Sequence, residues 1–157
     1  PAEDMVLKIK VAVEARRHGE TMIVARTDAR TAHGLDEALR RARLYEEAGA
    51  DVIFVESPES EAELERIGKE VSKPLLANMV EFGKTPRVEA ARLKQWGFDL
   101  AIYPGLGFSV AAEAMRMAWA HLKEQGTSVG VTVPQYRNMH ELMGFPEVWD
   151  FEKRWAQ

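Results

Sequence analysis

The sequence contains no cysteine, and this excludes several kinds of site from the chain. A disulfide scaffold, a zinc site built on thiolates and a cysteine nucleophile all depend on that residue. The absence also agrees with a reducing compartment, so we expect a cytoplasmic location.

The chain also lacks an excess of charge of one sign. It has 21 basic and 25 acidic side chains in 157 residues, which gives a net charge of −4 at pH 7. This balance offers no basic surface to nucleic acid or to an anionic membrane. No segment approaches the ~18 consecutive apolar residues of a membrane span, and charges throughout the first twenty residues argue against a signal peptide. We expect neither nucleic acid nor membrane as a partner.

Four short apolar segments recur along the chain and predict β-strands. They begin near residues 22, 51, 74 and 98, and a helical pattern follows each of them. Strands that are apolar on both faces and alternate with helices indicate a parallel sheet. The helices are expected over 4–18, from 35 to Gly49, from a capping box at Ser60 and Glu63, from an N-cap at Thr85 to Gly97, after Pro104, and twice between 138 and 157.

Two architectures agree with this order of elements. One is an open doubly wound sheet of four or five strands, and the other is half of an eight-stranded β/α barrel, a fold of about 250 residues. We expect a single partial barrel domain over 1–157. It would comprise a helix in 1–20, four βα units in 21–126 and C-terminal helices in 127–157.

A polar side chain follows each of the first three predicted strands. Arg26 ends the first, Glu56 the second and Asn78 the third. Ligands of parallel α/β folds bind at the carboxyl ends of the strands, so these groups should share one binding site. Arginine presents a planar fork to carboxylate or phosphate, and asparagine can donate and accept hydrogen bonds. The set suits a small anion rich in oxygen.

Structural roles are the alternative for each of these side chains. Arg26 lies two residues before Asp28, so the two point to the same side of the strand and could form a structural ion pair. Glu56 could cap the following turn, and Asn78 could bond its own backbone.

Six motifs, in order and covering almost the whole chain, resemble the isocitrate lyase/phosphoenolpyruvate mutase superfamily. The likeness is greatest to its small members, such as methylisocitrate lyase, oxaloacetate decarboxylase and carboxyphosphonoenolpyruvate phosphonomutase. Each motif is weak alone, whereas the ordered set is specific for the superfamily. The motifs are Ala25-Arg26-Thr27-Asp28-Ala29, Gly34-Leu35-Asp36-Glu37-Ala38, Tyr45-x-x-Ala48-Gly49-Ala50-Asp51, Glu56-Ser57-Pro58, Ala77-Asn78-Met79-x-Glu81 and Tyr103-Pro104.

The resemblance implies a (β/α)₈ barrel, of which this chain would supply the last four βα units and the C-terminal helices. It implies substrate binding by Arg26, Glu56, Asn78 and, through a looser match, Arg137. The family typically swaps its last helix onto a neighbouring subunit, so a homo-oligomer, specifically a tetramer, is expected. Where a further substrate arginine is common after the Tyr-Pro motif, this chain has Ser109.

The resemblance also implies Mg²⁺-dependent cleavage or decarboxylation of small 2-oxo or 2-hydroxy di- and tricarboxylates. The metal ligands and the acid/base cysteine of the family would precede Pro1. We therefore expect no metal site and no catalytic residue here, and no activity from this chain alone. The alternatives are a phosphonate mutase or hydrolase of the same superfamily and a non-catalytic half-barrel that self-associates.

Overall fold

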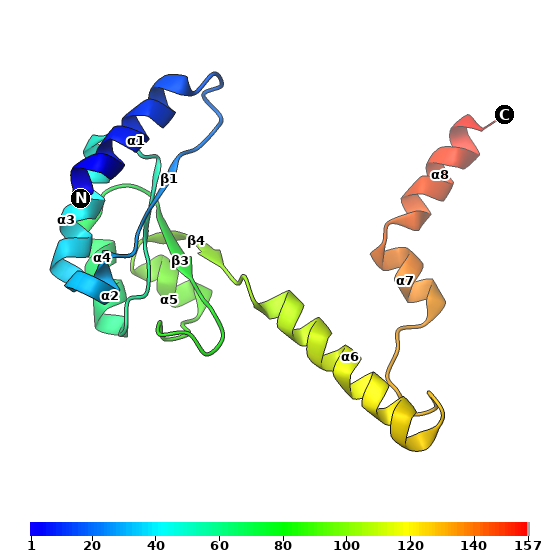
Figure 1. Ribbon diagram of the computed structural model, residues 1–157. Helices are drawn as coiled ribbons and strands as arrows, with labels where there is room; N and C mark the ends of the chain where they lie inside the picture. Colours follow the sequence, from blue (N-terminus) through cyan, green and yellow to red (C-terminus); the bar gives the residue numbers. More distant parts are fainter. Residues whose placement is uncertain (157) are drawn as a thin grey trace. The chain divides into compact units, whose positions relative to one another are not determined.

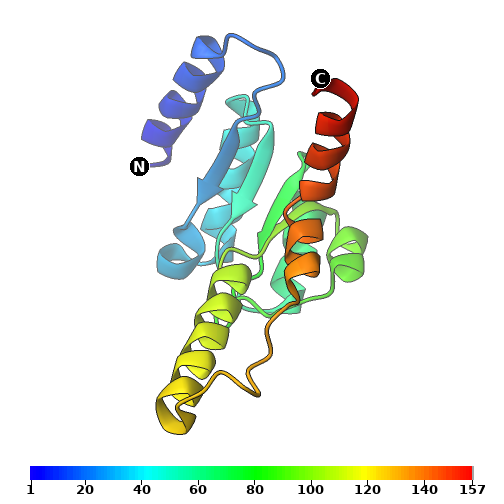
Figure 2. The same cartoon turned by 90° about the vertical axis from the view of Figure 1, so that its right-hand side faces the viewer.

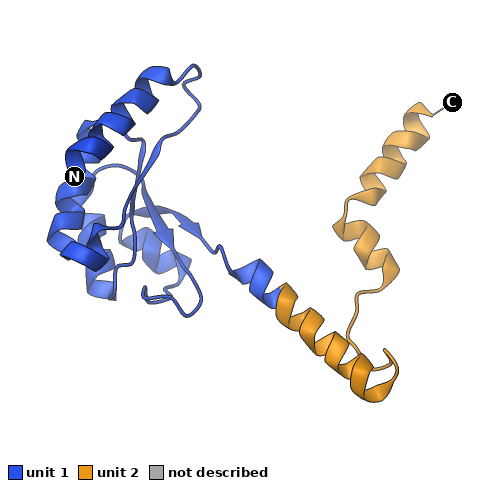
Figure 3. Cartoon of the chain, viewed as in Figure 1, with its two compact units in different colours: residues 1–110 blue, residues 111–157 orange. Residues whose placement is uncertain are grey.

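The computed structural model describes residues 1–156, which form two compact units (Figure 3). The first unit comprises Pro1–Val110 and the second begins at Ala111. The expected C-terminal segment 127–157 ends at Gln157, which lies outside the described residues. The assignment of the chain to one partial barrel domain stays a prediction.

A four-stranded parallel sheet forms the centre of the first unit (Figure 1). Its strands are paired in chain order, without the reversal of order that marks a doubly wound sheet. The predicted parallel α/β fold is therefore confirmed, and the strand order favours the barrel type. The strands are β1 (Val24–Thr27), β2 (Val52–Val55), β3 (Leu75–Asn78) and β4 (Phe98–Ile102).

The helices of this unit gather on one side of the sheet (Figures 1 and 2). Apolar side chains of the strands and helices form the core there, among them the buried Leu39, Ile53, Leu64, Leu75 and Leu93. Burial of this face is the main stabilising contribution. The helices are α1 (Ala2–Ala15), α2 (Ala29–His33), α3 (Leu35–Glu47), α4 (Glu61–Glu70) and α5 (Ala90–Gln95).

The predicted start of α5 at Thr85 is wrong. The helix begins at Ala90, after an extended Glu89 with φ −62° and ψ 143°. Val88 packs against the core cluster, and an extended segment brings its side chain there. The tertiary contact therefore overrides the local threonine–proline pattern.

The first helix also ends earlier than predicted, at Ala15 rather than at 18. Arg16 has extended backbone angles, and its Nη1 donates to Asp51 Oδ2 at 2.7 Å and to the Thr21 carbonyl oxygen at 3.1 Å. These bonds link the connection before β1 to Asp51, the residue before β2.

The capping box at Ser60 is confirmed in part. Ser60 Oγ accepts from the backbone N–H of Glu63 at 3.2 Å, as an N-cap does. The Glu63 carboxylate accepts from the N–H of Glu59 instead of returning to Ser60. The cap still fixes where α4 begins.

The second unit is helical. It contains most of α6 (Leu106–Gln125), together with α7 (Tyr136–Leu142) and α8 (Phe145–Trp155). None of the residues in these three helices is buried, although many are apolar. His140 contacts the rings of Tyr136, Phe145 and Trp149, with centroid distances of 4.9, 5.3 and 5.4 Å. No helix in residues 1–156 has the length and apolar character needed to cross a membrane.

Candidate functional site

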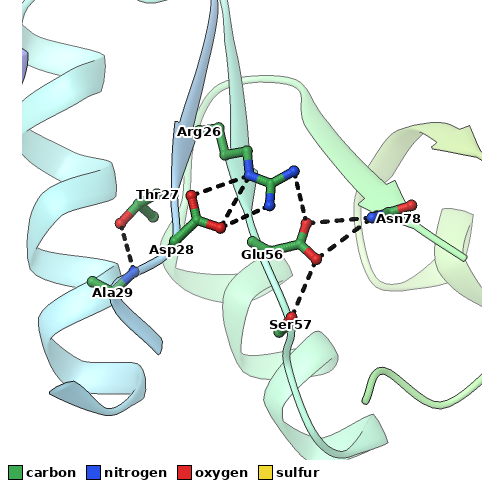
Figure 4. A network of polar contacts seen from close by, with 7 residues as sticks. All are labelled: Arg26, Thr27, Asp28, Ala29, Glu56, Ser57 and Asn78. Atoms are coloured by element: carbon green, nitrogen blue, oxygen red, sulfur yellow. Dashed lines mark hydrogen bonds and ion pairs between the residues drawn. The ribbon is translucent and has the colours of Figure 1, made fainter. Parts of the chain in front are cut away.

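Arg26, Glu56 and Asn78 meet at the carboxyl end of the sheet (Figure 4). Arg26 belongs to β1, Glu56 directly follows β2, and Asn78 ends β3. Arg26 Nη1 lies 3.4 Å from Glu56 Oε2, and Asn78 Nδ2 donates to the same oxygen at 3.4 Å. Three of the four predicted side chains are therefore neighbours, because parallel strands bring their carboxyl ends to one edge.

The Arg26 guanidinium is held by an ion pair and by an aromatic ring. Its Nη2 donates to Asp28 Oδ1 at 2.7 Å, and its Nε lies 3.2 Å from both oxygens of that carboxylate. The guanidinium carbon lies 5.0 Å from the centroid of the Phe54 ring, within cation–π range. The hydrogen bond to Asp28, with the charges of Glu56 and Asp28, raises the pKa of Arg26, so the guanidinium stays charged.

The anticipated ion pair between Arg26 and Asp28 is thus present, but it does not bury the group. The Arg26 side chain is 47% exposed and that of Asp28 is 66% exposed. An exposed ion pair contributes little to folding stability. An incoming anion could therefore replace Asp28 on the guanidinium at small cost.

Phe54 is a residue of the site that the sequence analysis did not single out. It pairs in register with Arg26 across β1 and β2, so both side chains lie on the same face of the sheet. Phe54 stands two residues before Glu56 in the sequence, and that alternation was the pattern that could have revealed it.

Glu56 is the most enclosed charge of the set, with a side chain that is 17% exposed. Its carboxylate accepts hydrogen bonds from side chains, including Ser57 Oγ at 3.1 Å. Ser57 has φ 57°, in the left-handed region that a residue other than glycine seldom adopts. Strained backbone of this kind clusters at functional sites. Through its contacts with Arg26 of β1 and Asn78 of β3, Glu56 links the ends of the three strands.

Asn78 points its amide nitrogen at Glu56, which fixes the orientation of its amide. The opposite atom, Oδ1, is buried without a hydrogen-bond partner among residues 1–156, and so is Glu81 Oε2 on the following turn. The Glu81 carboxylate lies beside Gly105, whose Cβ, if it had one, would be 3.2 Å from that oxygen. The loops after β3 and β4 therefore touch through this glycine.

A second ion-pair network fixes the segment after β1. Arg30 lies on α2, a short helix that the sequence analysis did not predict. Its Nη2 donates to Glu63 Oε1 at 2.7 Å, and its Nη1 lies 2.6 Å from Glu59 Oε1. The hydrogen bond from Arg30 lowers the pKa of Glu63. This network links the segment beside Arg26 to the beginning of α4.

We expect Glu63→Gln to lower the free energy of unfolding by about 1 kcal/mol at pH 7, because the pair with Arg30 is only partly exposed. The folded-state pKa of Glu63 lies below the usual 4.5, so its contribution is complete above pH 4.5 and is lost as the pH falls through the lower value. The two proteins should thus converge below pH 4.5 in urea unfolding. Glu20→Gln, an exposed residue, serves as the charge-matched control. A stability difference that stays constant down to the lowest pH would contradict this role.

The acidic side chains at the strand ends lie around Arg26. Asp28 and Glu56 both face the Arg26 guanidinium, and no group of three or more His, Asp or Glu in residues 1–156 is placed to hold a metal ion. The cation that these two carboxylates face is the Arg26 guanidinium.

Arg137, the fourth predicted binding residue, belongs to the second unit. It lies on α7, where its Nε donates to Glu141 Oε1 at 3.2 Å across one helical turn, and its side chain is 87% exposed. Its role in substrate binding stays a prediction.

A family model and several curated proteins match this chain. A family model described as phosphoenolpyruvate phosphomutase matches residues 1–123. The chain is 46% identical to 2,3-dimethylmalate lyase of Eubacterium barkeri over 156 residues, which are 98% of this chain and 54% of that enzyme. It is 41% identical to 2-methylisocitrate lyase of Aeropyrum pernix over 157 residues, which are 99% of this chain and 49% of that enzyme. The chain thus spans about half the length of these curated relatives.

Solved structures agree with the sequence comparison. The crystal structure of 2,3-dimethylmalate lyase, a member of the PEP mutase/isocitrate lyase superfamily, matches with a TM-score of 0.86 and 32% identity, over 98% of this chain and 55% of the enzyme. Phosphonopyruvate hydrolase in complex with oxalate and Mg²⁺ matches with a TM-score of 0.81 and 26% identity, over 100% of this chain and 57% of that protein. The sheet and its helices therefore correspond to part of a TIM-barrel fold.

Proposed function

Because the chain belongs to the phosphoenolpyruvate phosphomutase family, we propose that the protein carrying it is a carbon–carbon bond lyase of small 2-oxo or 2-hydroxy di- and tricarboxylic acids. The observation that carries the proposal is the convergence of Arg26, Glu56 and Asn78 at the carboxyl end of the sheet. Among the solved structures, 2,3-dimethylmalate lyase is 32% identical and phosphonopyruvate hydrolase 26% identical. The curated lyases are 46% and 41% identical over almost the whole chain, and together these values favour lyase over phosphonate chemistry.

Arg26 binds a carboxylate of the substrate in this proposal. The substrate takes the place of the exposed Asp28 on the guanidinium fork, which matches a carboxylate with two parallel hydrogen bonds. The Phe54 ring lies against the guanidinium and already restrains the Arg26 side chain, so Arg26 loses little conformational freedom when the anion binds. Neutralising the carboxylate and fixing its direction lowers the barrier to breaking the adjacent bond.

Glu56 and Asn78 hold the other oxygen atoms of the substrate. The Glu56 carboxylate can accept a hydrogen bond from a hydroxyl group, and the Asn78 amide can donate to a carbonyl oxygen. A hydroxyl group becomes a carbonyl group when the carbon–carbon bond breaks, so an adjacent acceptor and donor serve both states. The contacts of Glu56 with Arg26 and Asn78 are long, at 3.4 and 3.5 Å, so a ligand can replace them.

The proposal has three further parts. They are dependence on Mg²⁺, assembly into a homotetramer with swapped C-terminal helices, and a cytoplasmic location. Support for Mg²⁺ comes from phosphonopyruvate hydrolase, whose structure contains the ion with oxalate. Support for assembly comes from the apolar α6, α7 and α8, in which no residue is buried. Light scattering of the purified protein would give the oligomer size, and a monomer would exclude the swapped assembly.

The direct test is an assay of the full-length protein that carries residues 1–157. A panel of 2-hydroxy and 2-oxo acids, including 2,3-dimethylmalate and 2-methylisocitrate, would be incubated with MgCl₂ and followed by proton NMR. We expect a carbonyl product and a carboxylic acid in equal amounts. Turnover of phosphonopyruvate, seen by phosphorus NMR, without turnover of the panel would instead assign phosphonate chemistry. An absence of all turnover in a self-associating protein would favour the non-catalytic alternative.

A further inference from the structure

A small cavity beside Glu56 and Asn78 is lined in part by Lys84, a residue that the site described above does not include. Its volume is about 140 Å³, and Lys84 and Thr85 line it together with Glu56 and Asn78. Pockets for drug-sized ligands measure about 300–1,000 Å³, so this space suits one small group of a substrate, such as a carboxylate. The sequence analysis did not identify Lys84 as a site residue.

The charges at this edge of the sheet show why a second cation matters. Arg26 is flanked by the carboxylates of Asp28 and Glu56, so this trio has a net negative charge. A substrate with two carboxylates is repelled by that field, and a cationic side chain beside Glu56 reduces the repulsion in addition to the Mg²⁺ of the proposed function. Lys84, an exposed residue, is the cationic residue among those that line the cavity next to Glu56.

Lys84 has no carboxylate partner of its own among the described residues. The lysines that form ion pairs within 1–156 are Lys69, Lys94 and Lys153. An ammonium group that is not committed to an ion pair can bind an incoming anion without breaking an existing contact.

The backbone before Lys84 fixes where this side chain begins. The N–H of Gly83 donates to the Val80 carbonyl oxygen at 3.2 Å, closing a turn in which Phe82 has φ 60°. A Cβ on Gly83 would lie 3.3 Å from both that oxygen and Val80 Cβ, so the close turn favours glycine there. This turn leads directly from Asn78, at the end of β3, to the wall of the cavity.

We propose that Lys84 binds a second carboxylate of the substrate and makes the site selective for dicarboxylates over monocarboxylates. The inference rests on the proposed function, since it assumes that Arg26 binds the first carboxylate. The second carboxylate enters the cavity past Glu56 and meets the ammonium group of Lys84 and the hydroxyl group of Thr85. Lys84 is thus a specificity-determining residue on the loop after β3.

The test compares the binding of succinate and butyrate to the full-length protein by calorimetry. These probes have the same number of carbon atoms and differ in the second carboxylate. We expect Lys84→Met to weaken succinate binding about tenfold and to leave butyrate binding within about twofold, with Lys84→Arg restoring most of the affinity for succinate. Lys10→Met, which removes the same charge from an exposed position on α1, should change neither.

Each result supports or overturns the inference. Unchanged succinate affinity in Lys84→Met, or an equal loss for both probes, would overturn it while leaving the proposed lyase in place if the wild-type protein still cleaves its substrate. A wild-type protein that binds neither probe and cleaves no acid of the panel would overturn the proposed function and the inference together.

Discussion

Replacement of Arg26 by alanine is expected to lower kcat/KM of the full-length protein by about 100-fold or more. The substitution removes a charged fork that would make two hydrogen bonds to the substrate carboxylate, and truncating one partner of such a pair costs about 2–5 kcal/mol. It also leaves the Glu56 carboxylate, whose side chain is 17% exposed, facing the substrate without its neighbouring cation. Repulsion between Glu56 and the substrate adds to the loss.

The measurement is steady-state turnover of the acid that the wild-type protein cleaves. Arg26→Lys keeps the charge but not the planar fork, so we expect an intermediate loss. Arg40→Ala is the matched control, because Arg40 forms an exposed ion pair with Glu37 on α3, away from the strand ends. Normal kcat/KM in Arg26→Ala would refute its role in substrate binding.

Replacement of Gly68 by alanine is expected to destabilise the fold by about 3 kcal/mol or more, the upper range for added bulk in a packed interior. Gly68 lies inside α4, and a Cβ at this position would be 1.6 Å from the carbonyl oxygen of Trp96. That oxygen belongs to the backbone at the end of α5, so a side-chain rotation cannot relieve the overlap. The two helices would have to separate, and the approach to β4 would shift with them.

Helix propensity alone predicts that Gly68→Ala would stabilise the fold rather than destabilise it. Alanine is more favourable than glycine inside a helix by about 1 kcal/mol, so an unhindered site would be stabilised. Gly107 in the first turn of α6 provides the control without overlap, because a Cβ there meets no atom within 4 Å, although the gain in propensity is smaller there than in a helix interior. Urea unfolding of the two variants should therefore give changes of opposite sign. Equal stability of Gly68→Ala and the wild-type protein would show that α4 and α5 can separate without cost.

The sequence by itself determined the alternation of strands and helices and the residues at the strand ends. Apolar runs and helical spacing are local patterns, so β1 to β4 were placed to within about two residues, and the parallel sheet followed. Since parallel strands align their carboxyl ends, Arg26, Glu56 and Asn78 could be grouped before any coordinates were known. The ordered motifs then indicated the superfamily, and the family model that matches residues 1–123 agrees with it.

Only the tertiary structure decided which groups meet across long stretches of chain. Arg30 bonds Glu63 across 33 residues, and Gly68 touches Trp96 across a similar distance, although neither contact leaves a periodic pattern. Likewise, the segment predicted as the first turn of α5 is not helical, and its Val88 packs against the core. Local propensities are worth fractions of a kcal/mol per residue, whereas such contacts are worth more, so packing prevails where the two conflict. The place of Lys84 beside the cavity was decided in the same way, by the turn that closes the loop after β3.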